Sequence, residues 1–205
     1  MEDIEIVEQY LKEGSNEGLK IEFLSLRGAD LSNANLSKCN FAFADLCKAN
    51  LTKANLSEIN LSDADLSGAD LMFSYLGLAV LKGANLEGTL LSRSTLPYAN
   101  MTGASLIKAH LIMADMTGVN LSAADLTGAN LGGANLGGAN LMGANLTGAS
   151  LKLANLTGAN LTYADLSGAD LSEADLSSAL FYDSNLKGTN LDRTILTNTK
   201  GLILV

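Results

Sequence analysis

The stretch 130-NLGGANLGGANLMGANL-146 contains one leucine at every fifth residue. An amphipathic helix repeats its apolar residues every three or four positions, and a half-buried strand repeats them every two. Because a period of five fits neither element alone, each unit has to combine a short strand with a turn. Leu and the Ala two residues before it then point to one side, and the Asn between them points to the other.

The same period continues from Leu26 to Leu196 without a change of phase. The central residue is a large apolar one throughout, and it departs from Leu only at Phe41, Met101, Met116 and Phe181. Two residues earlier the chain has a small residue, most often Ala, with the bulkier Ile59 and Val119 as exceptions. We expect both positions to point inward and to fill one long aliphatic core.

The two residues after each Leu have to turn the chain. Gly at the second of them, as at Gly133 and Gly138, supplies the positive φ that the third residue of a type II turn requires. Between Asn33 and Asp63 this position holds residues with side chains, so we expect turns of another type there. If each unit turns the chain by about a right angle, four units close a coil, and about nine coils spaced by about 4.8 Å form a rod roughly 40 Å long.

Units such as ADLSNANL, ADLTGANL and ANLTYADL match the pattern A(D/N)LXX over nearly all of residues 24–199. In this pattern the chain resembles the pentapeptide repeat family. The resemblance implies an all-β solenoid, a right-handed quadrilateral parallel β-helix in which the Leu residues and the small residues form ladders along the axis. The period alone leaves open other solenoids with a different number of units per coil.

The two ends depart from the repeat. Residues 2–13 predict a helix, with Ile4, Val7 and Leu11 on one stripe and Gly14 as its C-terminal stop. We expect residues 1–20 to form a helical cap and linker, an order that resembles pentapeptide repeat proteins common in photosynthetic bacteria. The β-helix would occupy residues 21–200. The apolar tail, residues 201–205, either folds over the last coil or forms a surface for self-association.

The net charge of −9 is concentrated near the start, where residues 1–25 contain seven acids and two bases. The chain begins without a basic segment and contains no apolar run long enough for a membrane span, so we expect a cytoplasmic protein that does not contact a membrane. No run of Lys or Arg indicates direct nucleic-acid binding. Two cysteines are too few for a disulfide framework, and we expect free thiols, with Cys39 inward and Cys47 outward.

Catalysis needs a nucleophile or an acid–base pair that converges in a cleft, and the pattern predicts neither. The single histidine, His110, takes an outward position usually held by Asn or Asp, either as a surface substitution or as a binding contact. Asp45 and Asp65, one coil apart, would repel each other at about 5 Å, and the frequent Asn in such columns favours hydrogen bonds at the corners over cation binding. We therefore expect no enzyme, no cofactor and no metal.

Residues 71–113 break the outward pattern, because apolar side chains replace polar ones there. One interpretation is drift in the repeat, with Leu78, Pro97 and Tyr98 packing locally at a corner. The other is a patch for protein binding or dimerisation, since Met and aromatic residues around an Arg are typical of interfaces. The candidate interaction residues are Met72, Phe73, Tyr75, Leu90, Arg93, His110, Ile112 and Met113.

These observations favour a rigid, non-enzymatic scaffold that binds another protein or a second copy of itself, through the patch or the C-terminal end. The family resemblance implies an alternative, a DNA mimic that binds DNA gyrase and protects it from quinolones. Such mimicry needs a strongly negative rod, whereas the chain after residue 25 contains 15 acids and 11 bases. Residues 130–146, the most regular part of the repeat, are expected to carry the least functional information.

Overall fold

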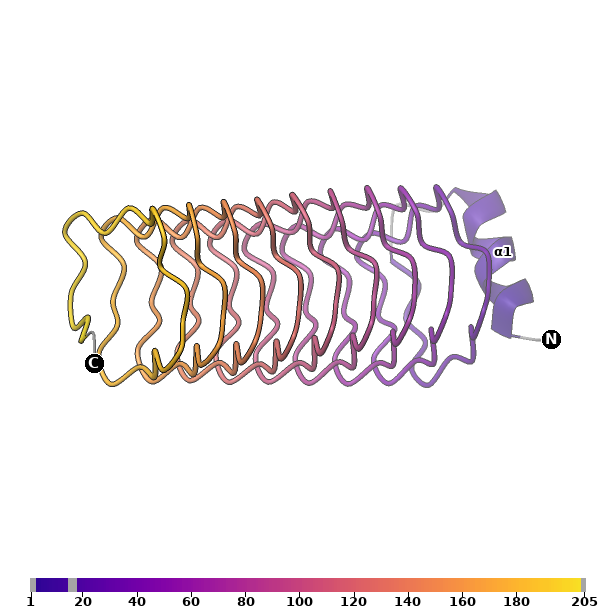
Figure 1. The fold of residues 1–205 in the computed structure, drawn as a ribbon. Helices are drawn as coiled ribbons and strands as arrows, with labels where there is room; N and C mark the ends of the chain where they lie inside the picture. Colours follow the sequence, from indigo (N-terminus) through magenta and orange to yellow (C-terminus); the bar gives the residue numbers. More distant parts are fainter. Residues whose placement is uncertain (1–2, 15–17, 204–205) are drawn as a thin grey trace.

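The computed structural model describes residues 3–14 and 18–203. It is a long stack of coils, with helix α1 (Asp3–Glu13) lying across one end (Figure 1). Among the described residues α1 is the one helix, and the walls of the coils are joined by isolated parallel bridges instead of extended strands. Every bridge joins residues 20 positions apart, from Lys20 with Asn40 to Leu180 with Lys200. Four five-residue units therefore form each coil, as the sequence predicts.

Each wall of a coil is a three-residue segment that exchanges backbone hydrogen bonds with the next coil. The Leu26 N–H donates to the Asp45 carbonyl at 2.7 Å, and the Asp45 N–H donates to the Leu24 carbonyl at 2.8 Å. Inside the coil, Leu136 and Ala134 are fully buried, and the same two positions are buried along most of the stack. Burial of each Leu side chain stabilises the fold by about 1.5–3 kcal/mol relative to exposure, which explains a core with so few aromatic residues.

The corners are closed by one hydrogen bond each, in which the N–H of the next small residue donates to the Leu carbonyl. Ala139 donates to Leu136 at 3.0 Å, and the residue between them, Gly138, has a φ of +65°. The prediction of another turn type between Asn33 and Asp63 is wrong, because these residues have φ values of +59° and +56°. The second turn residue of every unit from Phe23 to Asn198 has a positive φ, so residues with side chains adopt the same corner conformation as Gly, although it costs them about 1–2 kcal/mol each.

Helix α1 packs its apolar stripe onto the first coil. Val7 and Tyr10 are buried and join the aliphatic core, and Ile4 and Leu11 pack against it while partly exposed. Acidic residues occupy the first turn of α1, where they interact favourably with the helix dipole. The positive φ of Gly14, +63°, follows the last helical residue and agrees with the predicted stop.

The opposite end of the stack is partly open. Leu186, Leu191 and Leu196 in the last coil are only partly buried. Of the apolar tail, Leu202 packs against the core, whereas Ile203 is 70% exposed. Residues 204–205 lie outside the described part of the chain, as do residues 1–2 and residues 15–17 of the expected cap and linker. No helix in the described ranges has the length and apolar character that a membrane span requires.

Candidate functional site

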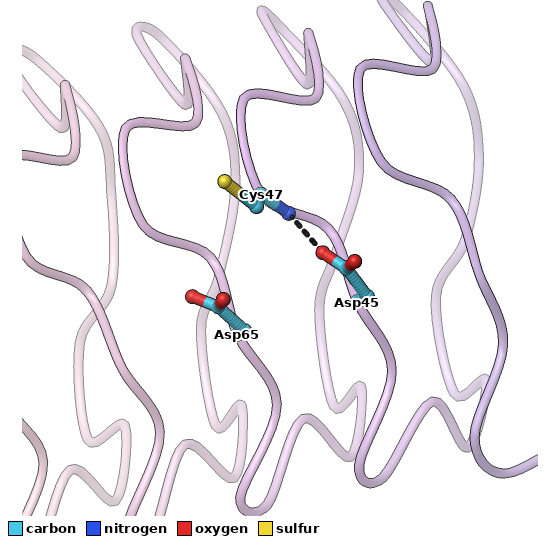
Figure 2. A group of neighbouring side chains, drawn as sticks. All are labelled: Asp45, Cys47 and Asp65. Atoms are coloured by element: carbon cyan, nitrogen blue, oxygen red, sulfur yellow. Dashed lines mark hydrogen bonds between the residues drawn. The ribbon is translucent and has the colours of Figure 1, made fainter.

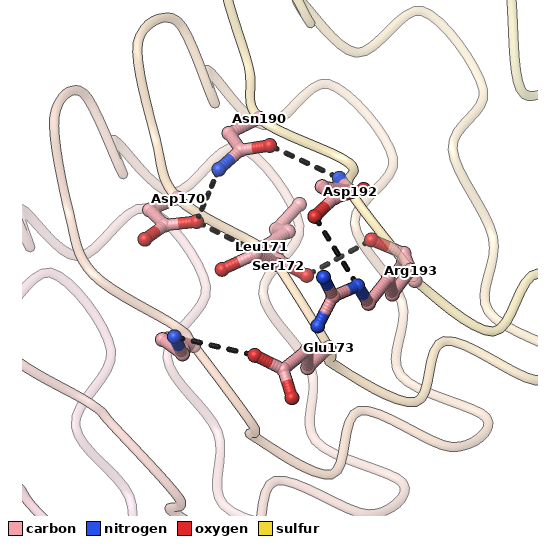
Figure 3. Close-up of polar contacts among 9 residues, drawn as sticks. Asp170, Leu171, Ser172, Glu173, Asn190, Asp192 and Arg193 are labelled. Carbon is pink, nitrogen blue, oxygen red and sulfur yellow. Dashed lines mark hydrogen bonds and ion pairs between the residues drawn. The ribbon is translucent and has the colours of Figure 1, made fainter.

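The outward Asn and Asp side chains are occupied by hydrogen bonds to their own corners. The Thr157 N–H donates to Asn155 Oδ1 at 3.0 Å, and Asn155 Nδ2 donates to Asn135 Oδ1, one coil earlier, at 3.0 Å. Figure 3 shows the same link between Asn190 Nδ2 and Asp170 Oδ1, again at 3.0 Å. The prediction that these columns cap the corners is confirmed.

The corner hydrogen bonds also act on the carboxylates. The backbone N–H of Ser172 lowers the pKa of Asp170, and the backbone N–H of Ser167 lowers the pKa of Asp165. A hydrogen bond that reaches the charged form of a carboxyl group stabilises that form. The pKa values are thus explained by the turns of the repeat and do not indicate an acid–base site.

One group of possible metal ligands occurs on a wall of the stack. Asp45, Cys47 and Asp65 place ligand atoms within 4.8 Å of one another (Figure 2). However, Asp45 Oδ1 accepts the Cys47 N–H at 3.0 Å, and Asp45 Oδ2 lies 3.7 Å from Arg27 Nη1. Asp65 Oδ1 accepts the Ser67 N–H at 2.9 Å. Turn hydrogen bonds and a neighbouring guanidinium account for this group, and the expectation that it binds no metal stays a prediction.

Both cysteines are free thiols in the structure. Cys39 points inward as expected, and burial raises the pKa of its thiol beside Tyr10. Cys47 is buried, with only 5% of the residue exposed, although its sulfur lies beside the outward carboxylates of Asp45 and Asp65. Ala42 and Ser172 hold the same position in their own turns and are also buried, whereas Ser32 and Ser57 at this position are partly exposed.

Five consecutive coils place their turn residues in one column, which we call the apolar corner. Its members are Met72 with Phe73, Ser92 with Arg93, Ile112 with Met113, Gly132 with Gly133, and Lys152 with Leu153. Backbone hydrogen bonds fix this order: the Arg93 N–H donates to the Ile112 carbonyl, and the Met113 N–H donates to the Gly132 carbonyl, both at 3.0 Å. Phe73 is 43% exposed and Met113 58% exposed. The stacking predicted from the 20-residue coil is confirmed.

The other candidate residues lie on the two walls beside the apolar corner. Leu90 and His110 are bridged neighbours on the wall before it, where Leu90 is partly buried and His110 is exposed. Tyr75 lies on the wall after it and is 55% exposed. The candidate residues therefore wrap around an edge of the stack instead of sharing one flat wall.

Beyond Tyr75, the next corner adds two apolar side chains, Leu78 and Tyr98, for which local packing is one of the two interpretations of the sequence. The ring of Tyr98 lies over Gly118, where an added Cβ would come within 2.5 Å of it, yet Tyr98 remains 64% exposed. Leu78, one coil before Tyr98, is 58% exposed. Local packing thus covers only part of these side chains, and both extend the apolar surface.

Two glycines interrupt the apolar corner and leave an open groove, the glycine notch. Ile112 and Met113 line one side of it and Lys152 and Leu153 the other, with a volume of about 460 Å³. The sequence does not predict this feature directly, because residues 130–146 follow the repeat without a break. The sequence does contain a signal for the groove. When the repeat is folded at 20 residues per coil, Gly132 and Gly133 lie between the bulky pairs Ile112–Met113 and Lys152–Leu153.

The apolar corner carries positive charge in a chain whose net charge is −9. Its cations are Arg93 and Lys152, and Lys53 lies in the same column one coil before Phe73. The first acid in this column is Glu173, whose Oε1 lies 3.2 Å from Lys152 Nζ (Figure 3). Among the described side chains Arg93 makes no ion pair.

The square coils, the turn-capping side chains and the aliphatic ladders define a four-sided parallel β-helix. Overlapping segments that together span residues 25–198 match the family model for pentapeptide repeats. The chain belongs to the pentapeptide repeat family, whose members form right-handed quadrilateral β-helices.

Two solved structures show how far the likeness extends. HetL, a pentapeptide repeat protein involved in heterocyst differentiation regulation from the cyanobacterium Nostoc sp. strain PCC 7120, is 33% identical with a TM-score of 0.77, and the match covers 96% of this chain and 97% of HetL. A trypsin-treated form of QnrB1, a plasmid-mediated fluoroquinolone resistance protein, is 24% identical with a TM-score of 0.53, over 89% and 84% of the two chains. Among curated proteins, no sequence matches.

Proposed function

We propose that this chain is a non-enzymatic scaffold that binds another protein through the apolar corner and the walls beside it. The observation that carries the proposal is the exposure of Phe73, Tyr75 and Met113 around Arg93, on a stack whose walls mostly display turn-capping Asn and Asp. Aromatic residues, Met and Arg are enriched where interfaces are buried most completely. A coil that is hydrogen-bonded on every wall presents these side chains without a change of shape, which lowers the entropic cost of binding.

The likeness to HetL supports a regulatory role for such binding, because HetL takes part in the regulation of a differentiation process and matches this chain along nearly its whole length. The likeness to QnrB1 extends to the fold only. A DNA mimic requires a continuous negative surface. Here Arg27 lies beside Asp45, and Lys53, Arg93 and Lys152 follow one corner, so the mixed charge favours the scaffold. An excess of the protein should leave supercoiling by DNA gyrase unchanged, and inhibition would instead favour the mimic.

The scaffold is tested by affinity capture from the native cell extract, with quantitative mass spectrometry of the captured proteins. Phe73→Asp and Met113→Asp place a charge on the apolar corner and should lose the proteins that the wild type captures. Met142→Asp is the matched control, since Met142 is 44% exposed at another corner. If all variants fold and capture the same proteins, the apolar corner is not the binding surface. Light scattering on the same variants shows whether the partner is a second copy.

A further inference from the structure

We propose that the glycine notch is the docking pocket of the scaffold, and that it accepts a partner segment with one large aliphatic or aromatic side chain beside an acidic residue. This inference rests on the proposed function and makes it specific, because it names one pocket and the chemistry of its occupant. It also gives a function to the part of the repeat that looks most regular in the sequence.

The shape of the notch fits one side chain. Its two sides, at Met113 and Leu153, are two coils apart, which corresponds to about 9.6 Å at the usual spacing of parallel segments. The floor is backbone whose N–H groups are already paired: Gly132 donates to Asn130 Oδ1 at 3.1 Å and Gly133 to the Lys152 carbonyl at 2.8 Å. A floor with paired N–H groups favours apolar contact over polar recognition. An inserted side chain would cover Met113 and Leu153, which are each 58% exposed.

The positive charge of Arg93 and Lys152 near the notch favours a partner with an acidic residue. Arg93 precedes the notch by two coils and has no ion pair among the described residues, and Lys152 lies at the rim and shares its charge with Glu173. Of the acids on the flanking walls, Asp115 Oδ1 accepts the Thr117 N–H at the next corner, and Asp70 Oδ1 accepts the Met72 N–H at the apolar corner itself, three coils before the notch. A carboxylate on the partner would therefore find an accessible guanidinium, whereas a basic segment would be repelled.

The repeat offers a matched pair of substitutions that separates the notch from the rest of the surface. Gly132 holds the first turn position, which accepts Met elsewhere in the chain, as at Met142. A Cβ at Gly132 would lie 3.3 Å from Asn130 Oδ1, and a Cβ at Gly137 would lie at the same distance from the equivalent Asn135 oxygen. Gly132→Met fills the notch, and Gly137→Met makes the same change at the next corner.

The experiment uses random 16-residue peptides displayed on phage, selected against the full chain. The enriched peptides are synthesised, and their binding is measured by fluorescence anisotropy. We expect an enriched pattern of one large apolar residue near Asp or Glu. The Kd should weaken at least tenfold in Gly132→Met and in Arg93→Glu, stay within twofold in Gly137→Met, and weaken with added salt because the charged contact is exposed.

Three results would overturn the inference. The first is peptides that bind Gly132→Met as well as the wild type, the second is enrichment of basic or uncharged peptides, and the third is no enrichment at all. The proposed function is judged separately by affinity capture with Phe73→Asp and Met113→Asp. If capture depends on those residues while Gly132→Met has no effect on it, the scaffold stands and the notch does not.

Discussion

Two adjacent glycines allow the left-handed corner to be tested without any change in packing. Gly138 has a φ of +65° and open space within 4 Å of an added Cβ, whereas Gly137 lies outside the left-handed region. Gly138→Ala should lower the free energy of unfolding by about 1–2 kcal/mol, because Ala is strained in the left-handed conformation. This loss is offset by about 0.4–1 kcal/mol, because Ala reduces the conformational entropy of the unfolded chain. The net loss of unfolding free energy should lie between about 0 and 1.6 kcal/mol, with a midpoint of about 0.8 kcal/mol.

Gly137→Ala adds the same methyl group one residue earlier in the turn. Thr157 holds this position one coil later and makes the same turn hydrogen bond, so a Cβ fits there. Without strain, the substitution should stabilise the fold by about 0.4–1 kcal/mol through the unfolded chain alone.

Urea unfolding of both variants, followed by circular dichroism, measures the difference as a shift in the midpoint at constant slope. The two midpoints should move in opposite directions from that of the wild type. Equal destabilisation by both substitutions would show that added volume, and not the sign of φ, controls the corner. The same outcome would weaken the assumption that Gly132→Met leaves the fold intact.

Three further changes test other parts of the structure. Asn155→Asp keeps the turn acceptor, removes the Nδ2 donor to Asn135 Oδ1 and places a second carboxylate beside its bridged neighbour Asp175. The lost hydrogen bond and the repulsion should together lower the unfolding free energy by at least about 1 kcal/mol in urea unfolding, and an unchanged value would show that the column contributes nothing. The pKa of Asp170 is lowered in the folded protein, so its ionised carboxylate stabilises the fold fully above its unfolded pKa. This stabilisation is lost as the pH falls below about 4. Asp170→Asn should therefore flatten the acid side of a profile of unfolding free energy against pH. Tyr10→Ala removes the ring that covers Cys39, and should speed modification of that thiol by a disulfide reagent without global unfolding; an unchanged rate would place the barrier elsewhere.

The sequence alone defines most of the fold, because a five-residue period with no change of phase assigns nearly every side chain to the inside or the outside. It did not predict the uniform corners. Phe43 and Ala123 adopt φ values of +60° and +55°, although neither residue type favours them. The corner conformation is set by closure of the coil, which is a property of four units together. A single unit therefore contains no sign of it unless Gly is present.

The sequence predicted the parts of the candidate site in which large side chains replace the usual turn residues. It did not predict the glycine notch, in which side chains are absent. Phe73, Arg93 and Met113 stood out because apolar and charged residues replaced Ser and Gly in their columns. Gly132 and Gly133 match the repeat in their own coil, so they become informative only beside Met113 and Leu153 in the coils before and after. The groove is a property of three stacked coils, and it appears only when the repeat is folded at 20 residues.

The repeat itself limits where specificity can reside in this protein. In most units, Leu and the small residue fill the core, and Asn or Asp caps the following corner, so three of the five positions are usually committed to the fold. The two corner positions remain variable, and the second accepts side chains at a cost of about 1–2 kcal/mol. A partner can therefore recognise this chain mainly through its corner columns. In such a column an absent side chain, as at Gly132, changes the surface as much as an exposed Phe73.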